Sequence, residues 1–346
     1  MDTTKKIYIF LIVITIVVVL IYAQAIIIPF ILAILFWFMI RVIKKLLSKI
    51  NFISRWPKWL LTIISSILLL SFLAFVIDMI TQNIQHISNT MPVYQANVNK
   101  LAKEINQRFN VDLFNMVSNF AKDLNFGDIL SKLISALTSL FGDAFTVILY
   151  LIFLLLEEPI FPMKLEAMYP DKKKYNHANN LISKIDHSIG NYIALKTLVS
   201  LLTGFLSYFV LLFIGVDAPF FWAFLIFVLN FIPTIGSLIA TLFPAIFALL
   251  QFGEFTPGIL VIAIVGAIQL VVGNLVEPRV MGNTLNISPL VVFLTLSLWG
   301  VMWGITGMLL SVPITVIIII IMAEFEGTRP FAILLSQRGS LKSFQQ

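Results

Sequence analysis

The length of its apolar runs constrains this chain most. Residues Ile7–Ile40 form 34 consecutive positions without a charged side chain, and Thr197–Thr328 contains one basic residue, Arg279. A helix needs about 20 apolar residues to cross a bilayer, where only helices and closed barrels can satisfy their backbone. The runs are continuous rather than alternating, which favours helices over a barrel. The sequence therefore predicts an all-α polytopic membrane protein.

Composition excludes several other classes of protein. The chain is 60% hydrophobic and 12% charged, with a mean hydropathy of +1.00, whereas soluble domains are about a quarter charged. It has no Cys and three His, so we expect no disulfide framework, no metal site and no cofactor. It has no nucleotide-binding phosphate loop and no catalytic nucleophile motif, so we expect neither an enzyme nor an ATP-driven pump. The net charge of +6 comes from loop residues, which favours membrane topology over nucleic-acid binding.

Basic flanks predict the topology of the first half. Lys5 and Lys6 precede the first run, and six basic residues follow it between 41 and 58. Because cytoplasmic loops are enriched in Lys and Arg, both flanks should be cytoplasmic. The run should therefore be a hairpin of two short spans that turns near Gln24–Pro29. A third span, Trp59–Met79, should place its far end outside.

The segment 81–142 is polar, but its apolar residues recur at helical spacing. The two sets are Val98, Leu101, Ile105 and Phe109, and then Ile129, Leu133, Ile134, Leu137 and Phe141. This spacing predicts extracytoplasmic amphipathic helices that pack on neighbouring spans or another subunit, or that capture substrate. A fourth span, Ala144–Leu156, is followed by a Lys-rich cytoplasmic segment with an amphipathic interfacial helix near 181–189.

Two similar repeats make up the C-terminal half. Each has a span followed by a 34-residue apolar stretch: Thr197–Ile214 with Pro219–Phe252, and Ile259–Val276 with Pro289–Met322. The stretches are interrupted at Ile232–Gly236 and Gly300–Gly307. Interrupted segments at corresponding places are typical of inverted-repeat transporters. We expect two re-entrant or broken helical hairpins, with ordinary kinked helices as the alternative.

In total we expect about eight membrane segments. The predicted domains are N-terminal membrane helices (1–80), an extracytoplasmic helical segment (81–142), a fourth span with a cytoplasmic segment (143–195), a transport core (196–322) and a cytoplasmic tail (323–346).

Polar side chains and backbone-breaking residues in the C-terminal half are candidates for a pathway. Non-helical backbone at membrane depth is tolerated only where it is buried or lines a cavity, and there it can bind a cation or a polyhydroxylated solute. The candidate residues are Asn230, Pro233, Thr234, Gly236, Gln269, Asn274, Gly304, Thr306 and Gly307. For each of them, a purely structural role in helix packing is the alternative.

The charged sequence Glu277-Pro278-Arg279 is a candidate gate or coupling site. Glu277 could pair with Arg279, and Pro278 would end the helix between them. The alternative is an interfacial anchor at the cytoplasmic end of the span.

Four stretches of the chain resemble the AI-2E family of bacterial membrane transporters. They are Asn230–Gly236 (Asn-Phe-Ile-Pro-Thr-Ile-Gly), Gly273–Gly282 (Gly-Asn-Leu-Val-Glu-Pro-Arg-Val-Met-Gly), Leu285–Leu290 and Gly304–Pro313. Residues Tyr192–Thr197 and Ser200–Gly204 further resemble the autoinducer-2 exporter branch, although many relatives have Gly-Gln where this chain has Leu195-Lys196. The resemblance implies a bacterial inner-membrane protein with cytoplasmic termini that forms a homo-oligomeric ring such as a pentamer. It also implies export of a small signalling furanone, or cation/proton antiport.

The leading hypothesis is export of a small polar solute such as autoinducer-2, a quorum-sensing signal, driven by a gradient and not by ATP. One alternative is a Na⁺(Li⁺)/H⁺ antiporter, which needs a proton-accepting carboxylate. Glu277 is the candidate, although Arg279 beside it favours the ionised form and counts against this role. A third hypothesis is a membrane scaffold that transports nothing.

Overall fold

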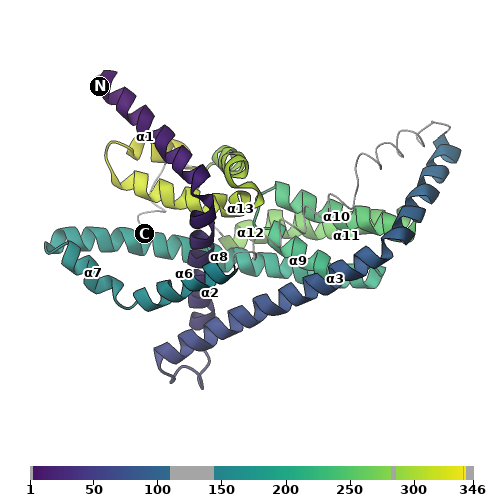
Figure 1. The fold of residues 1–346 in the computed structure, drawn as a ribbon, viewed down its shortest axis with the longest axis horizontal. Helices are drawn as coiled ribbons and strands as arrows, with labels where there is room; N and C mark the ends of the chain where they lie inside the picture. The colour runs from purple at the N-terminus through teal and green to yellow at the C-terminus, as the bar shows by residue number, and fades with distance from the viewer. Residues whose placement is uncertain (1–2, 110–143, 282–285, 338, 340–346) are drawn as a thin grey trace. The chain divides into compact units, whose positions relative to one another are not determined.

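The computed structural model describes residues 3–109, 144–281, 286–337 and 339, and these residues are almost entirely helical (Figure 1). Their only β pairing is an isolated bridge between Ile287 and Ser336. Six of the described helices are long and apolar enough to cross a membrane, or seven with one bent pair, which confirms an all-α polytopic membrane protein. The elements are α1 (Thr3–Tyr22), α2 (Gln24–Leu47), α3 (Lys58–Phe109), α6 (Ala144–Glu157), α7 (Phe161–Met168), α8 (Lys172–Ile214), α9 (Pro219–Leu229), α10 (Ile235–Phe252), α11 (Phe255–Val271), a π-helix (Val272–Val276), α12 (Glu277–Met281), α13 (Pro289–Glu324) and α14 (Arg329–Leu335).

The chain divides into two compact units. The first comprises Met1–Thr62, Thr138–Ile193 and Asn283–Gln346, and the second comprises Ile63–Leu137 and Ala194–Gly282. The helices α3 and α8 each run from one unit into the other, so each unit is described separately. The two interrupted stretches fall in different units: the break at Ile232–Gly236 lies in the second unit and the break at Gly304 lies in the first.

The expected N-terminal hairpin does not form. The Ala23 N–H donates to Val19 O and the Ile27 N–H donates to Ala23 O, so helical bonding continues from α1 into α2 with a one-residue interruption (Figure 1). Pro29 lies inside α2. A proline removes one helical bond and can bend a helix without reversing it, which explains why the predicted turn at Gln24–Pro29 is wrong.

Charged residues tie the helix ends of the first unit together. Arg41 of α2 pairs with Asp186 of α8 and with Glu158 after α6, and its guanidinium lies 4.7 Å from the centroid of the Trp37 ring. Trp37 Nε1 donates to Glu158 Oε2 at 2.8 Å. Arg41 thus joins three segments that are far apart in sequence.

The predicted fourth span, α6, has only 14 residues, and it is long enough to cross a membrane only together with α7 as one bent pair. The short helix α7 follows α6 at an angle of 66°. Two regions expected as separate elements prove continuous. The interfacial helix and the next span form the 43-residue α8, and the third span continues through the first amphipathic set in the 52-residue α3. The second amphipathic set, Ile129–Phe141, lies outside the described residues.

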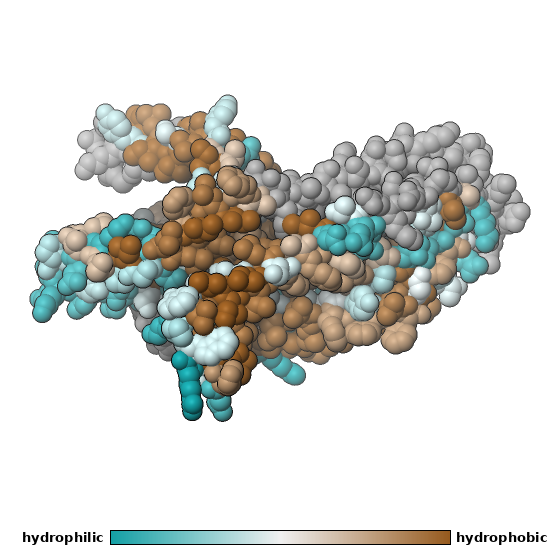
Figure 2. Space-filling model, turned by 60° about the horizontal axis from the view of Figure 1, so that its bottom comes forward, coloured by the Kyte–Doolittle hydropathy of each residue, from teal (hydrophilic) through white to brown (hydrophobic). Residues whose placement is uncertain are grey.

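The core of the second unit lies between α9 and α10. Phe221 and Trp222 of α9 and Phe247 of α10 are fully buried, and the Trp222 and Phe247 rings are 4.9 Å apart. Many large apolar side chains on other faces are exposed instead, and Figure 2 shows broad areas of hydrophobic side chains on the face turned to the viewer. Exposed apolar surface of this extent is expected where helices contact lipid.

Candidate transport site

The first break is built by local backbone geometry. Helix α9 ends at Leu229 and α10 begins at Ile235, with Thr234 at a positive φ of 61° between them. A Cβ on Gly236 would lie 1.8 Å from Leu229 O, so only glycine lets α10 start this close to the end of α9. Since Trp222 of α9 contacts Phe247 of α10, the two helices fold back on each other.

A line of buried polar residues on α8 faces this break. Lys196, Ser200, Thr203 and Ser207 recur every three or four residues, which places them on one side of the helix, here called the α8 polar face. All four are at most 4% exposed. The Asn230 amide, at the end of α9, donates to Ser200 Oγ at 3.3 Å and to Thr203 Oγ1 at 3.5 Å. The break thus presents its amide to hydroxyls within an otherwise apolar bundle.

An ion pair closes one end of the α8 polar face. Lys196 Nζ lies 2.5 Å from Glu277 Oε1, with side chains 5% and 24% exposed. Arg279 is exposed, so the partner of Glu277 is Lys196 rather than Arg279. A charge pair this well buried is costly to separate, because either partner alone would keep an uncompensated charge in a low dielectric.

Pro278 does not end the helix, contrary to expectation. The turn Val272–Val276 winds as a π-helix, and the Glu277 N–H bonds to Val272 O five residues earlier. Pro278 then lies inside α12. The wider turn places its extra residue directly before the proline. Proline has no N–H, so it leaves no helical donor unpaired at this point. Such π-turns are frequent at functional sites.

Four buried polar atoms have no protein hydrogen-bond partner among the described residues. They are Thr197 Oγ1, Ser207 Oγ, Trp222 Nε1 and Gln269 Nε2, and all belong to the second unit. Most buried polar groups in proteins are paired, so unpaired ones point to a bound solute or water. Gln269, a predicted pathway residue, is 7% exposed.

The other predicted residues of the second unit lie in less enclosed places. Pro233 is half-buried, while Thr234 and Asn274 are exposed. The structure therefore brings Asn230, directly after α9, to the α8 polar face, and it brings Glu277 to Lys196. It does not place Asn274 or Arg279 in a buried site.

The second break has similar backbone geometry but apolar surroundings. Gly304 interrupts α13 with φ 62° and ψ −142°, and a Cβ on Gly307 would lie 2.0 Å from Trp299 O. Trp299, Trp303 and Leu310 form a buried cluster against residues of α1 and α2. Trp303 Nε1 donates to Leu20 O at 3.0 Å. Thr306 is half-buried in this break.

The residues of the α8 polar face were not among the predicted site residues, although the sequence carries a signal for them. Four polar residues at helical spacing in an apolar span mark a buried polar stripe. No group of three His, Asp or Glu that could hold a metal ion occurs among the residues that the structure describes.

Comparisons with known proteins now identify the family. The pattern of the AI-2E family transporters matches residues 9–327. The chain belongs to the AI-2E family. It is 32% identical over 321 residues to the AI-2 transport protein TqsA of Escherichia coli K12, covering 91% of this chain and 90% of that one. It is 36% identical over 252 residues to a putative transport protein of Borreliella burgdorferi (71% and 67%). It is 30% identical over 334 residues to a putative transport protein of Haemophilus influenzae (93% and 92%). This AI-2E protein is thus a multi-pass membrane transporter and not an enzyme.

Proposed function

We propose that this AI-2E protein exports a small polar solute such as autoinducer-2. The observation that carries the proposal is the contact of Asn230, at the first break, with Ser200 and Thr203 on the α8 polar face. A relative of similar length is an AI-2 transport protein. Buried hydroxyls and amides can exchange hydrogen bonds with a hydroxylated solute, which suits a site without net charge.

Gradient-driven transport follows from the groups available. The charges beside the α8 polar face, Lys196 and Glu277, compensate each other. A neutral solute can therefore enter without adding an uncompensated charge to the low-dielectric interior. The chain carries no ATP-binding phosphate loop, so the solute gradient or an ion gradient supplies the energy. In this proposal the first break lines the pathway, and Glu277, Pro278 and Arg279 form its gate or coupling element.

We propose that the protein acts in the bacterial inner membrane as a homo-oligomeric ring, with both termini in the cytoplasm and a role in quorum sensing. Because the chain has no Cys, a single cysteine at Gln95 reports topology. An impermeant thiol reagent should label it in intact cells. Labelling only after permeabilisation would invert the proposed orientation.

Two threonines provide a matched test of the site. Thr203 Oγ1 donates to Val199 O at 2.9 Å and Thr295 Oγ1 donates to Val291 O at 2.8 Å, but only Thr203 also accepts from Asn230. In proteoliposomes, wild-type protein should release autoinducer-2 faster than empty liposomes do. Thr203→Val should slow this efflux and Thr295→Val should not. No efflux from wild-type protein would refute the proposed substrate.

The ion pair favours a second candidate function, Na⁺(Li⁺)/H⁺ antiport. A cation that binds Glu277 would replace Lys196 as its counter-charge, and an unpaired ammonium is costly to keep in the interior. A Na⁺ gradient imposed on liposomes with an internal pH dye tests this function. Na⁺-dependent proton movement that disappears in Glu277→Gln would favour the antiporter over the exporter.

A non-transporting scaffold is the remaining alternative, and a substitution at the first break distinguishes it from a transporter. Pro233→Ala should reduce flux while the oligomer stays folded. Gly236→Ala is unsuitable for this purpose, because its Cβ would overlap Leu229 O and disturb the fold itself. Full flux in Pro233→Ala would remove the break from the transport pathway.

A further inference from the structure

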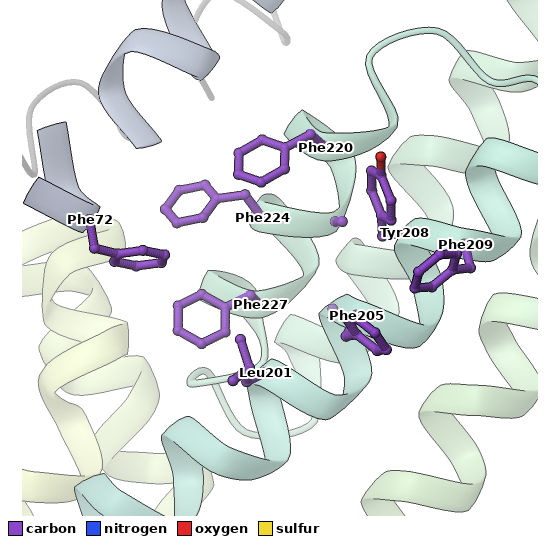
Figure 3. A pocket seen from close by; sticks show the side chains of 10 residues that line it. Phe72, Leu201, Phe205, Tyr208, Phe209, Phe220, Phe224 and Phe227 are labelled. Atoms are coloured by element: carbon purple, nitrogen blue, oxygen red, sulfur yellow. The ribbon is translucent and has the colours of Figure 1, made fainter. Parts of the chain in front are cut away.

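An aromatic groove runs between α3, α8 and α9 in the second unit (Figure 3). It encloses about 300 Å³. Phe220, Phe224 and Phe227 of α9 form one wall, and Phe72 of α3 faces them (Figure 3). The lining is almost wholly apolar, so the groove offers little to a polar solute and is distinct from the α8 polar face.

Small residues create this groove and open it to the bilayer. A Cβ on Gly204 would lie 3.0 Å from Ala223 O and 3.2 Å from Phe227 Cβ, so the α8 and α9 backbones are in close contact beneath the rings. Phe205 is 59% exposed and Leu201 is 54% exposed at the opposite edge. Both α8 and the relevant part of α3 are candidate membrane spans, so the groove opens to hydrocarbon.

A polar cavity adjoins the end of the groove. It encloses about 430 Å³ and is lined by Gln82 and Asn83 of α3 and by the α8–α9 connection around Asp217. Phe220 lines the groove and its neighbour Pro219 lines the cavity, so the two lie beside each other at the start of α9. This polar cavity is called the cup below. It has a carboxylate and two amides, and no Lys or Arg among its described lining residues.

The cup is held in a fixed shape. Gln251 of α10 donates to Gly215 O at 2.8 Å and accepts from the Asp217 N–H at 2.7 Å. The Tyr94 hydroxyl donates to Asp217 Oδ2 at 2.8 Å. These contacts keep the carboxylate at the cup without a basic partner among the described lining residues. Its charge is therefore complementary to a cationic group.

We propose that groove and cup together bind one phospholipid with an amine-bearing head group, such as phosphatidylethanolamine. The acyl chain lies along the aromatic groove, and the ammonium lies against Asp217 in the cup. Burial of its methylene groups against the aromatic rings favours binding of the acyl chain. A charge-assisted hydrogen bond to the Asp217 carboxylate favours binding of the ammonium group. A head group with only negative charge finds no cation among the described lining residues. The proposal is independent of the transported solute.

Lipid retention by the full-length protein tests the proposal. The protein, purified from an equimolar mixture of phosphatidylethanolamine and phosphatidylglycerol, should retain the amine lipid by about tenfold over the glycerol lipid in native mass spectrometry. Asp217→Asn should remove this preference, because the backbone contact to Gln251 and a partner for Tyr94 both remain. Ala223→Leu should fill the groove and lose the retained lipid. The matched substitution Ala263→Leu, on an exposed face of α11, should not.

A photo-crosslinking phosphatidylethanolamine on wild-type protein avoids any dependence on the folding of variants. Labels should concentrate on Phe205 and Phe209 rather than on Ile264, which is similarly exposed on α11. Equal labelling of both places, or equal retention of the two lipids, would overturn the proposal. A change of oligomeric mass in Ala223→Leu with lipid retention unaltered would assign the groove to a second copy of the chain.

Discussion

The two breaks of this AI-2E protein share a backbone device and differ in everything around it. At each break a residue with positive φ precedes a glycine that rests on a carbonyl oxygen, Leu229 O for Gly236 and Trp299 O for Gly307. The first break presents Asn230 to hydroxyls of α8, whereas the second is packed against the Trp299–Trp303 cluster. A broken helix is thus not by itself a polar site, because the neighbouring helix determines what the break contacts.

The largest effect should come from filling either glycine. In Gly236→Ala the new Cβ would lie 1.8 Å from Leu229 O, and in Gly307→Ala it would lie 2.0 Å from Trp299 O. Neither backbone oxygen can move without reshaping its helix end. Each should lower stability by about 3 kcal/mol or more. Thermal unfolding in detergent measures this, with Gly327→Ala, whose Cβ meets nothing within 4 Å, as control. Tolerance at one break alone would show that the shared geometry is not required at both.

The next effect concerns the ion pair between Lys196 and Glu277, which lies beside the first break. Glu277→Gln leaves the Lys196 ammonium buried without a counter-charge, which should cost about 3–5 kcal/mol. The double variant Lys196→Gln, Glu277→Gln should recover most of this loss, because it leaves no charge to compensate. Unfolding midpoints of the wild type, of the single variants Lys196→Gln and Glu277→Gln, and of the double variant form a double-mutant cycle. Additive losses would mean that the two residues are not coupled.

The unpartnered amide at Gln269 should separate stability from activity. Gln269→Leu removes a buried Nε2 that has no hydrogen-bond partner among the described residues, so stability should rise by about 1 kcal/mol while autoinducer-2 efflux falls. Ser297→Ala on α13, whose hydroxyl bonds within its own helix, should change neither by much. Unchanged efflux in Gln269→Leu would remove this residue from the pathway.

The smallest effect should come from Tyr94, which braces the far end of the α9–α10 hairpin. Burial, together with the hydrogen bond to Asp217 and its charge, raises the pKa of Tyr94 above its ordinary value. The folded state therefore holds this proton more tightly than the unfolded chain. The resulting stability is complete below about pH 10 and declines as the pH rises further. The difference in unfolding midpoint between wild type and Tyr94→Phe should stay constant from pH 8 to about pH 10 and should narrow at higher pH. A difference that stayed constant there as well would contradict this reading.

Much of the fold could be predicted from the sequence, because long apolar runs and glycine-proline interruptions act locally. Both breaks lie where the sequence predicted them. The prediction of an N-terminal hairpin was wrong because a proline by itself can bend a helix but does not reverse the chain direction. The partner of Glu277 was wrong as well: sequence proximity suggested Arg279, whereas Lys196 is 81 residues away and meets Glu277 only through tertiary packing.

The most direct measurement compares the two breaks in one assay. Asn230→Leu and Thr306→Val each replace a polar side chain at a break by an apolar one of similar size. Both variants are reconstituted at equal yield. We expect Asn230→Leu to slow autoinducer-2 efflux from proteoliposomes by about tenfold and Thr306→Val to stay within about twofold of wild type. Equal losses in the two variants, or full efflux in Asn230→Leu, would contradict the assignment of the solute site to the first break.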